Sequence, residues 1–178
     1  VIVGLSSTGR AVYEDAENSG IGTNGLTAAR HQLLAPDYGE RFPEAFDPRV
    51  AQHAYQGRLH LSDPLPGSRM TVGAALSSPT RTYSPIVASL PRDLLGAVSA
   101  IFHNSGGGLT KCLPFGRGVR YIKDDLFPRP PIFRLIEEHA AVPMREMCRV
   151  YNMGHRLEIV VEPSRADEVI SISLRFGV

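Results

Sequence analysis

Three consecutive glycines, Gly106, Gly107 and Gly108, are the clearest chemical signal in the chain. They come shortly after an apolar run that ends at His103, and Ser105 directly precedes them. Glycine has no Cβ, so this backbone can adopt positive φ and approach another group closely, although ordering it costs more entropy than ordering other residues. Backbone N–H groups in a glycine turn that leads into a helix start can bind phosphate or another anion. The segment therefore predicts an anion site.

A plain strand-to-helix turn is the alternative interpretation of these glycines, because glycine is also the commonest loop residue. The run matches neither the P-loop pattern nor the dinucleotide-binding pattern G-x-G-x-x-G. The glycines alone leave both interpretations open, and other segments have to decide between them.

Three further segments have the composition of loop-to-helix anion sites: "GLSSTG" (4–9), "TNGLTAAR" (23–30) and "SPTRTY" (78–83). Plain capping of a helix is the alternative for each. Their candidate residues are Ser6, Ser7, Asn24, Gly25, Thr80 and Arg81.

The elements that must position these residues alternate between strands and helices. Apolar runs and alternating patterns predict strands at 1–6, 96–103, 118–124 and 156–162. Helical spacing and proline or serine start signals predict helices at 26–34, 77–91, 130–140, 143–152 and 163–177, with a short helix start after the glycines. Residues 36–68 show no sustained period and are expected to be irregular. The class is α+β, a layered α/β sandwich with a mixed sheet.

The helix expected at 163–177 has the strongest pattern. Ser164 and Asp167 have the spacing of a capping box. Its apolar stripe consists of Ala166, Val169, Ile170 and Leu174.

Composition limits the possible partners. The chain has 178 residues, 43% of them hydrophobic and 21% charged, which fits a single globular domain. Its net charge of +1 gives no electrostatic footprint for nucleic acid or an anionic membrane surface. No apolar stretch approaches the roughly 20 residues that span a bilayer, so a cytoplasmic protein is expected. Cys112 and Cys148 are expected to be free thiols.

A metal site is not expected in this chain. Its histidines show no paired ligand spacing and lie apart from the cysteines in sequence. Glu137, Glu138 and Glu146 fit the solvated faces of amphipathic helices. Because Val1 already lies within a strand-like run and Gly177 resembles a helix terminus, we also expect the chain to be a piece of a longer protein.

Four motifs together resemble one family. "VIVGLSSTG…TNGLTAAR", "LSSPTRTY", "HNSGGGLTK" and "VYNMGHRLEIVVEP" occur in the order and approximate spacing of the C-terminal domain of aminoimidazole ribonucleotide synthetase, also called phosphoribosylformylglycinamidine cyclo-ligase. Formylglycinamidine ribonucleotide synthetase, selenophosphate synthetase, thiamine monophosphate kinase and a hydrogenase maturation protein are similar in this domain. "PTRTY" and "YNMGHR" favour the cyclo-ligase.

The resemblance implies a homodimeric enzyme of purine biosynthesis. An N-terminal domain, absent from residues 1–178, would supply the acidic Mg²⁺ ligands and much of the ATP site, so this domain alone would be inactive. In the family, ATP phosphorylates the formyl amide oxygen of formylglycinamidine ribonucleotide, and nitrogen attack expels phosphate to close the imidazole ring. The products are ADP, phosphate and aminoimidazole ribonucleotide.

The resemblance also gives roles to the candidate residues. Ser105 and the three glycines would contact an anion, in this interpretation a substrate phosphate. Thr80 and Arg81 would hold charge or anchor a loop. His103 is the candidate catalytic residue, as a donor to a phosphoryl oxygen, with capping of a neighbouring carbonyl as the alternative. The residues expected to line the cleft from the first loop are Ser6, Ser7, Asn24 and Gly25.

The sequence departs from the family pattern in two places. The family has a histidine directly before the Ser-Asn-Gly of the first loop, whereas this chain has Gly22, and "RAVYEDAENSG" (10–20) lengthens that loop. The family's "NCGVG"-like turn is Asn152 to Arg156 here, which adds a cation. A related kinase-like enzyme and a non-catalytic anion-binding, regulatory or dimer-forming module therefore remain as alternatives.

Overall fold

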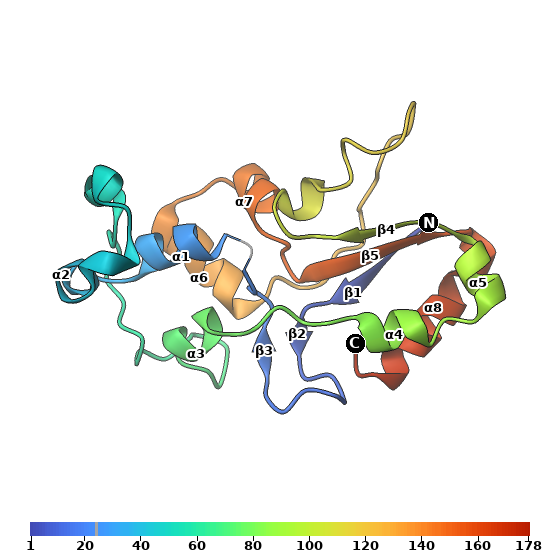
Figure 1. Ribbon diagram of the computed structural model, residues 1–178, viewed down its shortest axis with the longest axis horizontal. Helices are drawn as coiled ribbons and strands as arrows, with labels where there is room; N and C mark the ends of the chain where they lie inside the picture. Colours follow the sequence, from blue (N-terminus) through green and yellow to red (C-terminus); the bar gives the residue numbers. More distant parts are fainter. Residues whose placement is uncertain (24) are drawn as a thin grey trace.

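The computed structural model describes residues 1–23 and 25–178. The molecule is elongated, with a small sheet and its covering helices in one half and a helical cluster in the other (Figure 1). Each half has its own hydrophobic core. The helices are α1 (Leu26–Leu33), α2 (Asp37–Arg41), α3 (Val72–Leu76), α4 (Ser84–Ala88), α5 (Arg92–Gly96), α6 (Pro131–Ala140), α7 (Met144–Val150) and α8 (Ala166–Arg175).

Three strands form the main sheet, in the order β1 (Ile2–Ser6), β5 (His155–Val161) and β4 (Val98–His103). Both pairings are antiparallel. The α+β class is confirmed, and the described sheet is antiparallel where a mixed one was predicted. Two short strands, β2 (Thr8–Gly9) and β3 (Asn18–Ser19), pair separately within the first loop.

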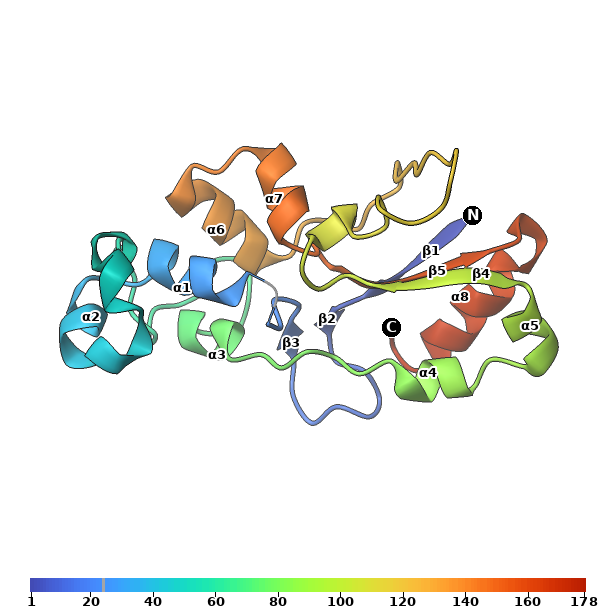
Figure 2. The ribbon, with the colours of Figure 1, turned by 45° about the horizontal axis from the view of Figure 1, so that its top comes forward.

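Central strand β5 has different chemistry on its two faces. Leu157, Ile159 and Val161 pack into the core beneath α4, α5 and α8, which cover one face of the sheet (Figure 2). Arg156 and Glu158 alternate with them and are also buried. A strand with a neighbour on each side can carry buried charges only where other groups satisfy them. Strand β5 therefore holds two buried charged side chains, Arg156 and Glu158, and each needs partners.

The helical half is built by α1, α3, α6 and α7. Leu33, Phe133, Ile136 and Met147 are fully or nearly fully buried in its core. The apolar spacing that predicted helices at 26–34, 130–140 and 143–152 is confirmed by α1, α6 and α7. Residues 36–68 contain only short α and 3₁₀ pieces, as expected, among them Pro43–Ala45 and Pro48–His53.

Three predicted elements were wrong or too long. Residues 118–124 form no strand, because the segment lies mostly exposed and pairs with no neighbouring strand. The helix predicted at 77–91 is limited to α4, which begins near Pro85, while α3 and α5 on either side of this segment were not predicted. After the glycines the chain forms only the 3₁₀ turn Gly108–Thr110.

Helix α8 differs from its prediction in its cap and its buried face. A 3₁₀ turn over Pro163–Arg165 precedes it, and no side chain caps its start, so the expected capping box does not form. Val169 is buried as predicted, but Ile170 and Leu174 are exposed, and Ile172 is buried instead. The sheet contacts a helix face rotated from the one that the apolar stripe indicated.

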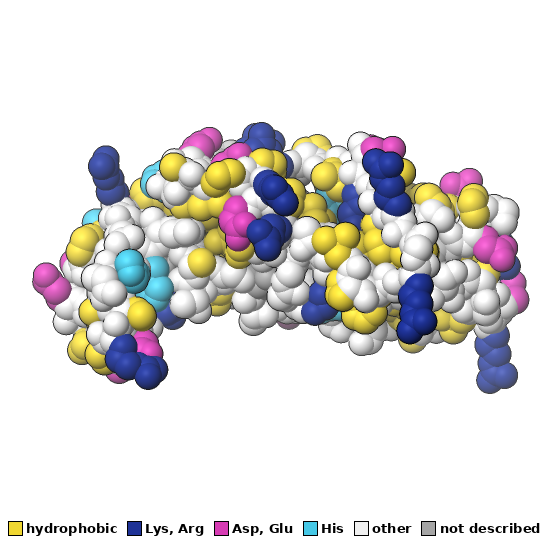
Figure 3. Space-filling view, turned by 90° about the horizontal axis from the view of Figure 1, so that it is seen from above, with side chains coloured by type: hydrophobic (Ala, Val, Ile, Leu, Met, Phe, Trp, Pro, Cys, Tyr) yellow, Lys and Arg dark blue, Asp and Glu magenta, His cyan; other side chains and the backbone are white. Residues whose placement is uncertain are grey.

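Both thiols are free. Cys112 and Cys148 form no disulfide, as expected. On the face in Figure 3, acidic and basic side chains are interspersed and neither gathers in one patch. Across residues 1–23 and 25–178, no helix has both the length and the apolar character that a bilayer crossing requires.

Candidate functional site

Five segments meet at one end of the main sheet. Because β1 and β4 both run antiparallel to β5, their last residues lie beside the start of β5. The loops that leave these ends bring together segments that are far apart in the sequence. We call this region the strand-end junction and define it as residues 6–9, 20–23, 80–83, 103–105 and 152–156.

Asn152 links three parts of the junction. Its Nδ2 donates to the Gly20 carbonyl at 2.9 Å, and its Oδ1 accepts from Ser7 Oγ at 3.1 Å and from the Gly154 amide at 2.9 Å. The Ser7 amide donates to the Gly154 carbonyl at 2.9 Å. Ser7 is buried, and its hydroxyl is used inside the protein.

Arg81 anchors the first loop. Its guanidinium makes five bonds: to both carboxylate oxygens of Glu14, at 2.9 and 2.6 Å, and to the carbonyls of Ser6, Thr8 and Gly9, at 2.8–3.0 Å. Partial burial alone would raise the pKa of Glu14, but its bonds to Arg81 and to the Ala11 amide outweigh burial and hold that pKa below its usual value. Of the two roles that the sequence left open for Arg81, these contacts describe the anchor.

Arg156 is the second buried arginine of the junction and is 1% exposed. Its Nη2 donates to the carbonyls of Ile21, at 2.7 Å, and Gly20, at 3.4 Å, and its Nη1 donates to that of Asn104 at 3.4 Å. Nε has no partner. Burial lowers the pKa of Arg156, and its interaction with the nearby Tyr83 hydroxyl opposes that effect only in part. No carboxylate in the described part of the chain forms an ion pair with it.

The three glycines have two different environments. Gly106 and Gly107 are exposed, and their amides donate no hydrogen bond within the described residues. Gly108 is buried at φ +50°, where a Cβ would lie 2.6 Å from the Cys148 carbonyl oxygen and closer still to that of Tyr151. The third glycine thus packs on the end of α7, and the first two leave their amides open. Ser105 precedes them, half-buried.

Anion binding at this turn would use the open amides of Gly106 and Gly107 and could not draw on a helix dipole. A 3₁₀ turn of three residues has no appreciable helix dipole to add, because that effect needs many aligned peptide units. Lys111 supplies a positive charge nearby: its Cα would lie 3.6 Å from a Cβ at Gly107.

His103 is exposed at the end of β4. Partial burial and the charges of Arg156 and Lys111 lower its pKa below the usual value, so the neutral ring predominates at pH 7. Its ring makes no hydrogen bond in the described part of the chain, so the predicted carbonyl cap is not seen there. With Thr80 and Tyr83 it lines a hollow of about 660 Å³.

Of the remaining candidates, Ser6 and Gly25 do not line this hollow, whereas Thr80 does. Ser6 ends β1, and its hydroxyl bonds with Thr8. A Cβ at Gly25 would lie 2.8 Å from Tyr151 Cδ1, so Gly25 packs on the helical half. Thr80 Oγ1 accepts from the Thr23 amide at 3.3 Å. Asn24 lies outside the described residues.

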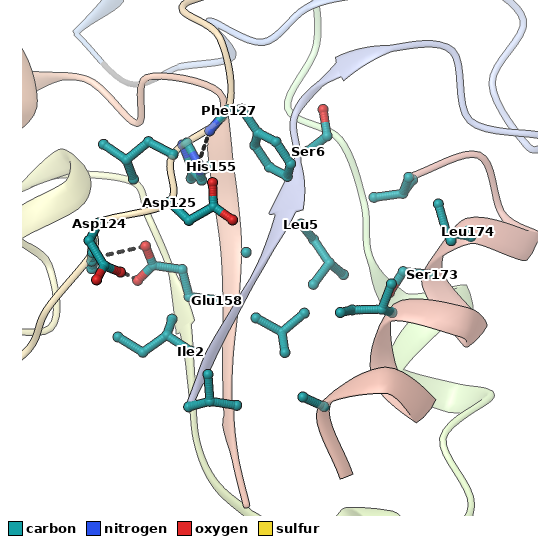
Figure 4. A pocket seen from close by; sticks show the side chains of 18 of the residues that line it. Ile2, Leu5, Ser6, Asp124, Asp125, Phe127, His155, Glu158, Ser173 and Leu174 are labelled. Carbon is teal, nitrogen blue, oxygen red and sulfur yellow. Dashed lines mark hydrogen bonds and ion pairs between the residues drawn. The ribbon is translucent and has the colours of Figure 1, made fainter. Parts of the chain in front are cut away.

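A second hollow, of about 490 Å³, follows the free edge of β1 between α8 and residues 122–127 (Figure 4). Lys123 Nζ there lies 2.7 Å from both carboxylate oxygens of Glu158. His155 stacks on Phe127 with ring centroids 4.4 Å apart, and burial lowers the pKa of His155 to about 4. Of the candidate site residues from the sequence, only Ser6 lines this hollow.

Two residues central to the junction were not among the predicted site residues. Asn152 and Arg156 both belong to the turn that carried part of the resemblance, and the added cation was the available signal. For a metal, residues 1–23 and 25–178 bring together no group of three histidine, cysteine or acidic side chains.

Comparison with known proteins gives one consistent finding. No protein-family model matches the chain. It is 34% identical over 153 residues to a phosphoribosylformylglycinamidine cyclo-ligase of Methanopyrus kandleri, which covers 86% of this chain and 37% of that protein. For the proteins of the same name from Methanothermobacter thermautotrophicus and Sorangium cellulosum, the identities are 37% over 157 residues and 31% over 166 residues. These alignments cover 88% and 90% of this chain, and 40% and 41% of the relatives. The chain thus spans about two fifths of the length of these relatives.

Proposed function

The chain is homologous to phosphoribosylformylglycinamidine cyclo-ligases over most of its length, and from this premise we propose that it forms the C-terminal domain of such an enzyme. The observation that carries the proposal is identity of 31–37% along 86–90% of the chain. The proposed reaction is the ATP-dependent conversion of formylglycinamidine ribonucleotide to aminoimidazole ribonucleotide, in a cytoplasmic homodimer.

The role proposed for this chain is to hold a phosphate-type oxyanion at the strand-end junction and at the glycine turn that directly follows residues 103–105. The open amides of Gly106 and Gly107 are donors of the kind that stabilise phosphoryl oxygens, and fixed donors need no reorganisation during reaction. Lys111 and the buried Arg156 add positive charge near His103. Phosphoryl transfer relies mainly on positioning and electrostatic stabilisation, which such groups supply.

The proposed cofactors divide between this chain and the rest of the enzyme. A phosphate of ATP or of the substrate fits the glycine amides. Mg²⁺ prefers carboxylate oxygens and water, and the described residues do not gather acidic side chains into one group. We therefore assign no Mg²⁺ ligand and no metal-dependent step to this chain, and place the metal ligands in the N-terminal part of the enzyme.

An assay of the full-length protein tests this function. Purified enzyme is incubated with formylglycinamidine ribonucleotide, Mg²⁺ and ATP, and aminoimidazole ribonucleotide and ADP are measured. We expect both products in equal amounts and none without ATP. Residues 1–178 alone are expected to give no turnover. A folded full-length protein that forms no product would refute the proposal.

A variant pair connects the assay to the glycine turn. Gly106→Pro removes one open amide, while Gly106→Ala keeps it and adds a Cβ that meets no atom within 4 Å. We expect a loss in kcat/KM of about tenfold to a hundredfold for the proline variant, in line with the loss of one oxyanion donor. The alanine variant is expected to stay within about twofold of wild type. Equal losses would argue against an amide contact.

A further inference from the structure

We propose that Arg156 supplies the buried positive charge of an oxyanion site, and that its guanidinium occupies the space that a side chain at position 22 would otherwise fill. The proposal rests on the function proposed above in placing the ligand, a phosphate-type oxyanion, at the strand-end junction. Its geometric part concerns residues 22 and 156 alone.

The first step is the space beside Gly22. A Cβ at this position would lie 2.7 Å from Thr80 Oγ1 and closer still to Arg156 Nη2. Gly22 has φ +51°, a left-handed conformation in which histidine and asparagine are tolerated better than most residues. The obstacle to a side chain at position 22 is therefore chiefly the guanidinium. The space between the first loop and β5 can therefore hold the Arg156 guanidinium or a side chain at position 22, but not both.

The second step is the sequence on both sides of that space. In the family pattern that the chain resembles, a histidine precedes the Ser-Asn-Gly of the first loop, and this chain has Gly22 there. Where the family has its glycine-rich turn, this chain has Arg156, which is the second residue of β5. The two departures look unrelated along the chain, yet the structure brings them into contact. The guanidinium of Arg156, a residue of β5, thus occupies the space that a side chain at position 22 of the first loop would fill.

The third step is the incomplete pairing of Arg156. Its two Nη atoms donate to the carbonyls of Gly20, Ile21 and Asn104, while Nε has no partner. Asn104 Oδ1 is also buried without a partner. Carbonyls carry no net charge, so the positive charge of this side chain is not neutralised. A buried charge without an opposite charge is costly, and a bound anion would relieve that cost.

The fourth step is the place where the anion would bind. Thr80 shares the space beside Gly22 with the guanidinium and lines the hollow that also includes Tyr83 and His103. The charge of Arg156 acts on His103, as does that of Lys111. Two residues that line the hollow, Thr80 and His103, thus lie under the influence of the buried charge. Arg156 would attract the anion through the protein, because its own atoms are covered.

A double-mutant cycle on the 178-residue chain tests the shared space. The four proteins are wild type, Gly22→His, Arg156→Gly and the double variant, and urea unfolding gives the unfolding equilibrium constant of each. We expect both single variants to be destabilised, Gly22→His by overlap with Arg156 and Arg156→Gly by loss of its bonds and packing. The double variant should be about tenfold more stable than the product of the two single effects predicts, because without Arg156 the histidine has room; this is within the range measured for residues in contact. Additive effects would overturn the shared-space inference.

Titration with inorganic phosphate tests the charge. The ring signals of His103 are followed by NMR in wild type and in Arg156→Met, which keeps much of the side-chain volume and removes the charge. We expect phosphate to shift the His103 signals of wild type and to bind at least about tenfold more weakly to the variant, a change of the size that losing the attraction of one nearby buried charge gives. Arg165→Met is the matched control, since Arg165 pairs with Asp93 and Glu168 away from the junction.

A variant that keeps the charge, and the results that would contradict the inference, complete the phosphate test. Arg156→Lys keeps the charge, so it should bind phosphate within a few-fold of wild type even if it is less stable. Phosphate binding that is unchanged in Arg156→Met, lost in a folded Arg156→Lys, or absent in wild type would overturn the charge inference. None of these measurements involves turnover, so failure of the cyclo-ligase assay and failure of this inference can be told apart.

Discussion

Arg81 and Arg156 are both buried at the strand-end junction, but only Arg81 has every nitrogen of its guanidinium hydrogen-bonded. Arg81 makes five bonds and faces the carboxylate of Glu14. Arg156 reaches three carbonyls, has an unpartnered Nε and pairs with no carboxylate of the described chain. A guanidinium whose hydrogen-bonding capacity is filled from within the protein fixes structure. One that is only partly filled and faces no carboxylate leaves its positive charge free to attract an anion.

This contrast explains why residue type alone could not assign roles. An arginine beside threonines at a helix start fits anion binding and loop anchoring equally well. The anchor follows for Arg81 only once Glu14, 67 positions away in the sequence, is seen to approach it. For Arg156, the open capacity follows only from the absence of any such partner among the residues described.

Arg81→Met should have the largest effect on stability. It would remove the charge partner of Glu14 and one donor from each of three carbonyls, and breaking such a pair on one side costs about 3 kcal/mol or more. Urea unfolding of the variant measures this loss. Arg165→Met, in an exposed ion-pair cluster, should change stability by less than about 0.5 kcal/mol. A similar small change for Arg81→Met would remove the distinction between anchor and open cation.

The stability of the protein should depend on pH through the titration of His155, the neighbour of Arg156. Burial lowers the pKa of His155 to about 4, against about 6.5 in the unfolded chain. Between these values the unfolded state binds more protons, so stability is complete above pH 6.5 and falls as the pH is lowered toward 4. We expect a loss on the order of 2 kcal/mol over this window.

The variant His155→Gln provides the control for that titration. Its unfolding free energy, measured by urea titration at several pH values, should change less between pH 6.5 and 4 than that of wild type. Glu14 contributes on the acid side of this window: its lowered pKa adds stability that is lost only as the pH falls below its unfolded value. Identical slopes in wild type and variant would exclude His155 as the source.

Gly108→Ala should be more destabilising than Gly106→Ala. At position 108 the new Cβ would overlap the carbonyl oxygens at the end of α7, and φ +50° adds strain, so about 2 kcal/mol is expected. At position 106 it meets no atom within 4 Å, and the change should stay within about 0.5 kcal/mol. Thermal or urea unfolding measures both. Equal costs would mean that the glycines do not divide into packed and open residues.

Arg156→Met should cost less stability than Arg81→Met in the absence of phosphate. It removes a buried charge and leaves no carboxylate unpaired, so a change below about 1 kcal/mol is expected. Urea unfolding in phosphate-free buffer measures it. A loss as large as that of Arg81→Met would place the two arginines in the same structural class.

The sequence could predict those elements whose pattern is local. β4, α1, α6 and α7 follow from apolar spacing and proline starts, because those signals act within one or two turns. Residues 118–124 alternate like a strand, but an alternating run needs a neighbour to pair with, and none of the described strands does so. Ile170 and Leu174 lie outside the buried face of α8 for a similar reason: the sheet decides which side of a helix it covers.

By itself the sequence determined the family resemblance, the α+β class and a glycine turn after β4. Only the tertiary structure divided the three glycines, showed Arg81 satisfied by Glu14 and brought Arg156 into the space beside Gly22. The physical reason is that hydrogen-bond satisfaction and shared volume depend on distances between segments 40 or more positions apart, which no local pattern encodes.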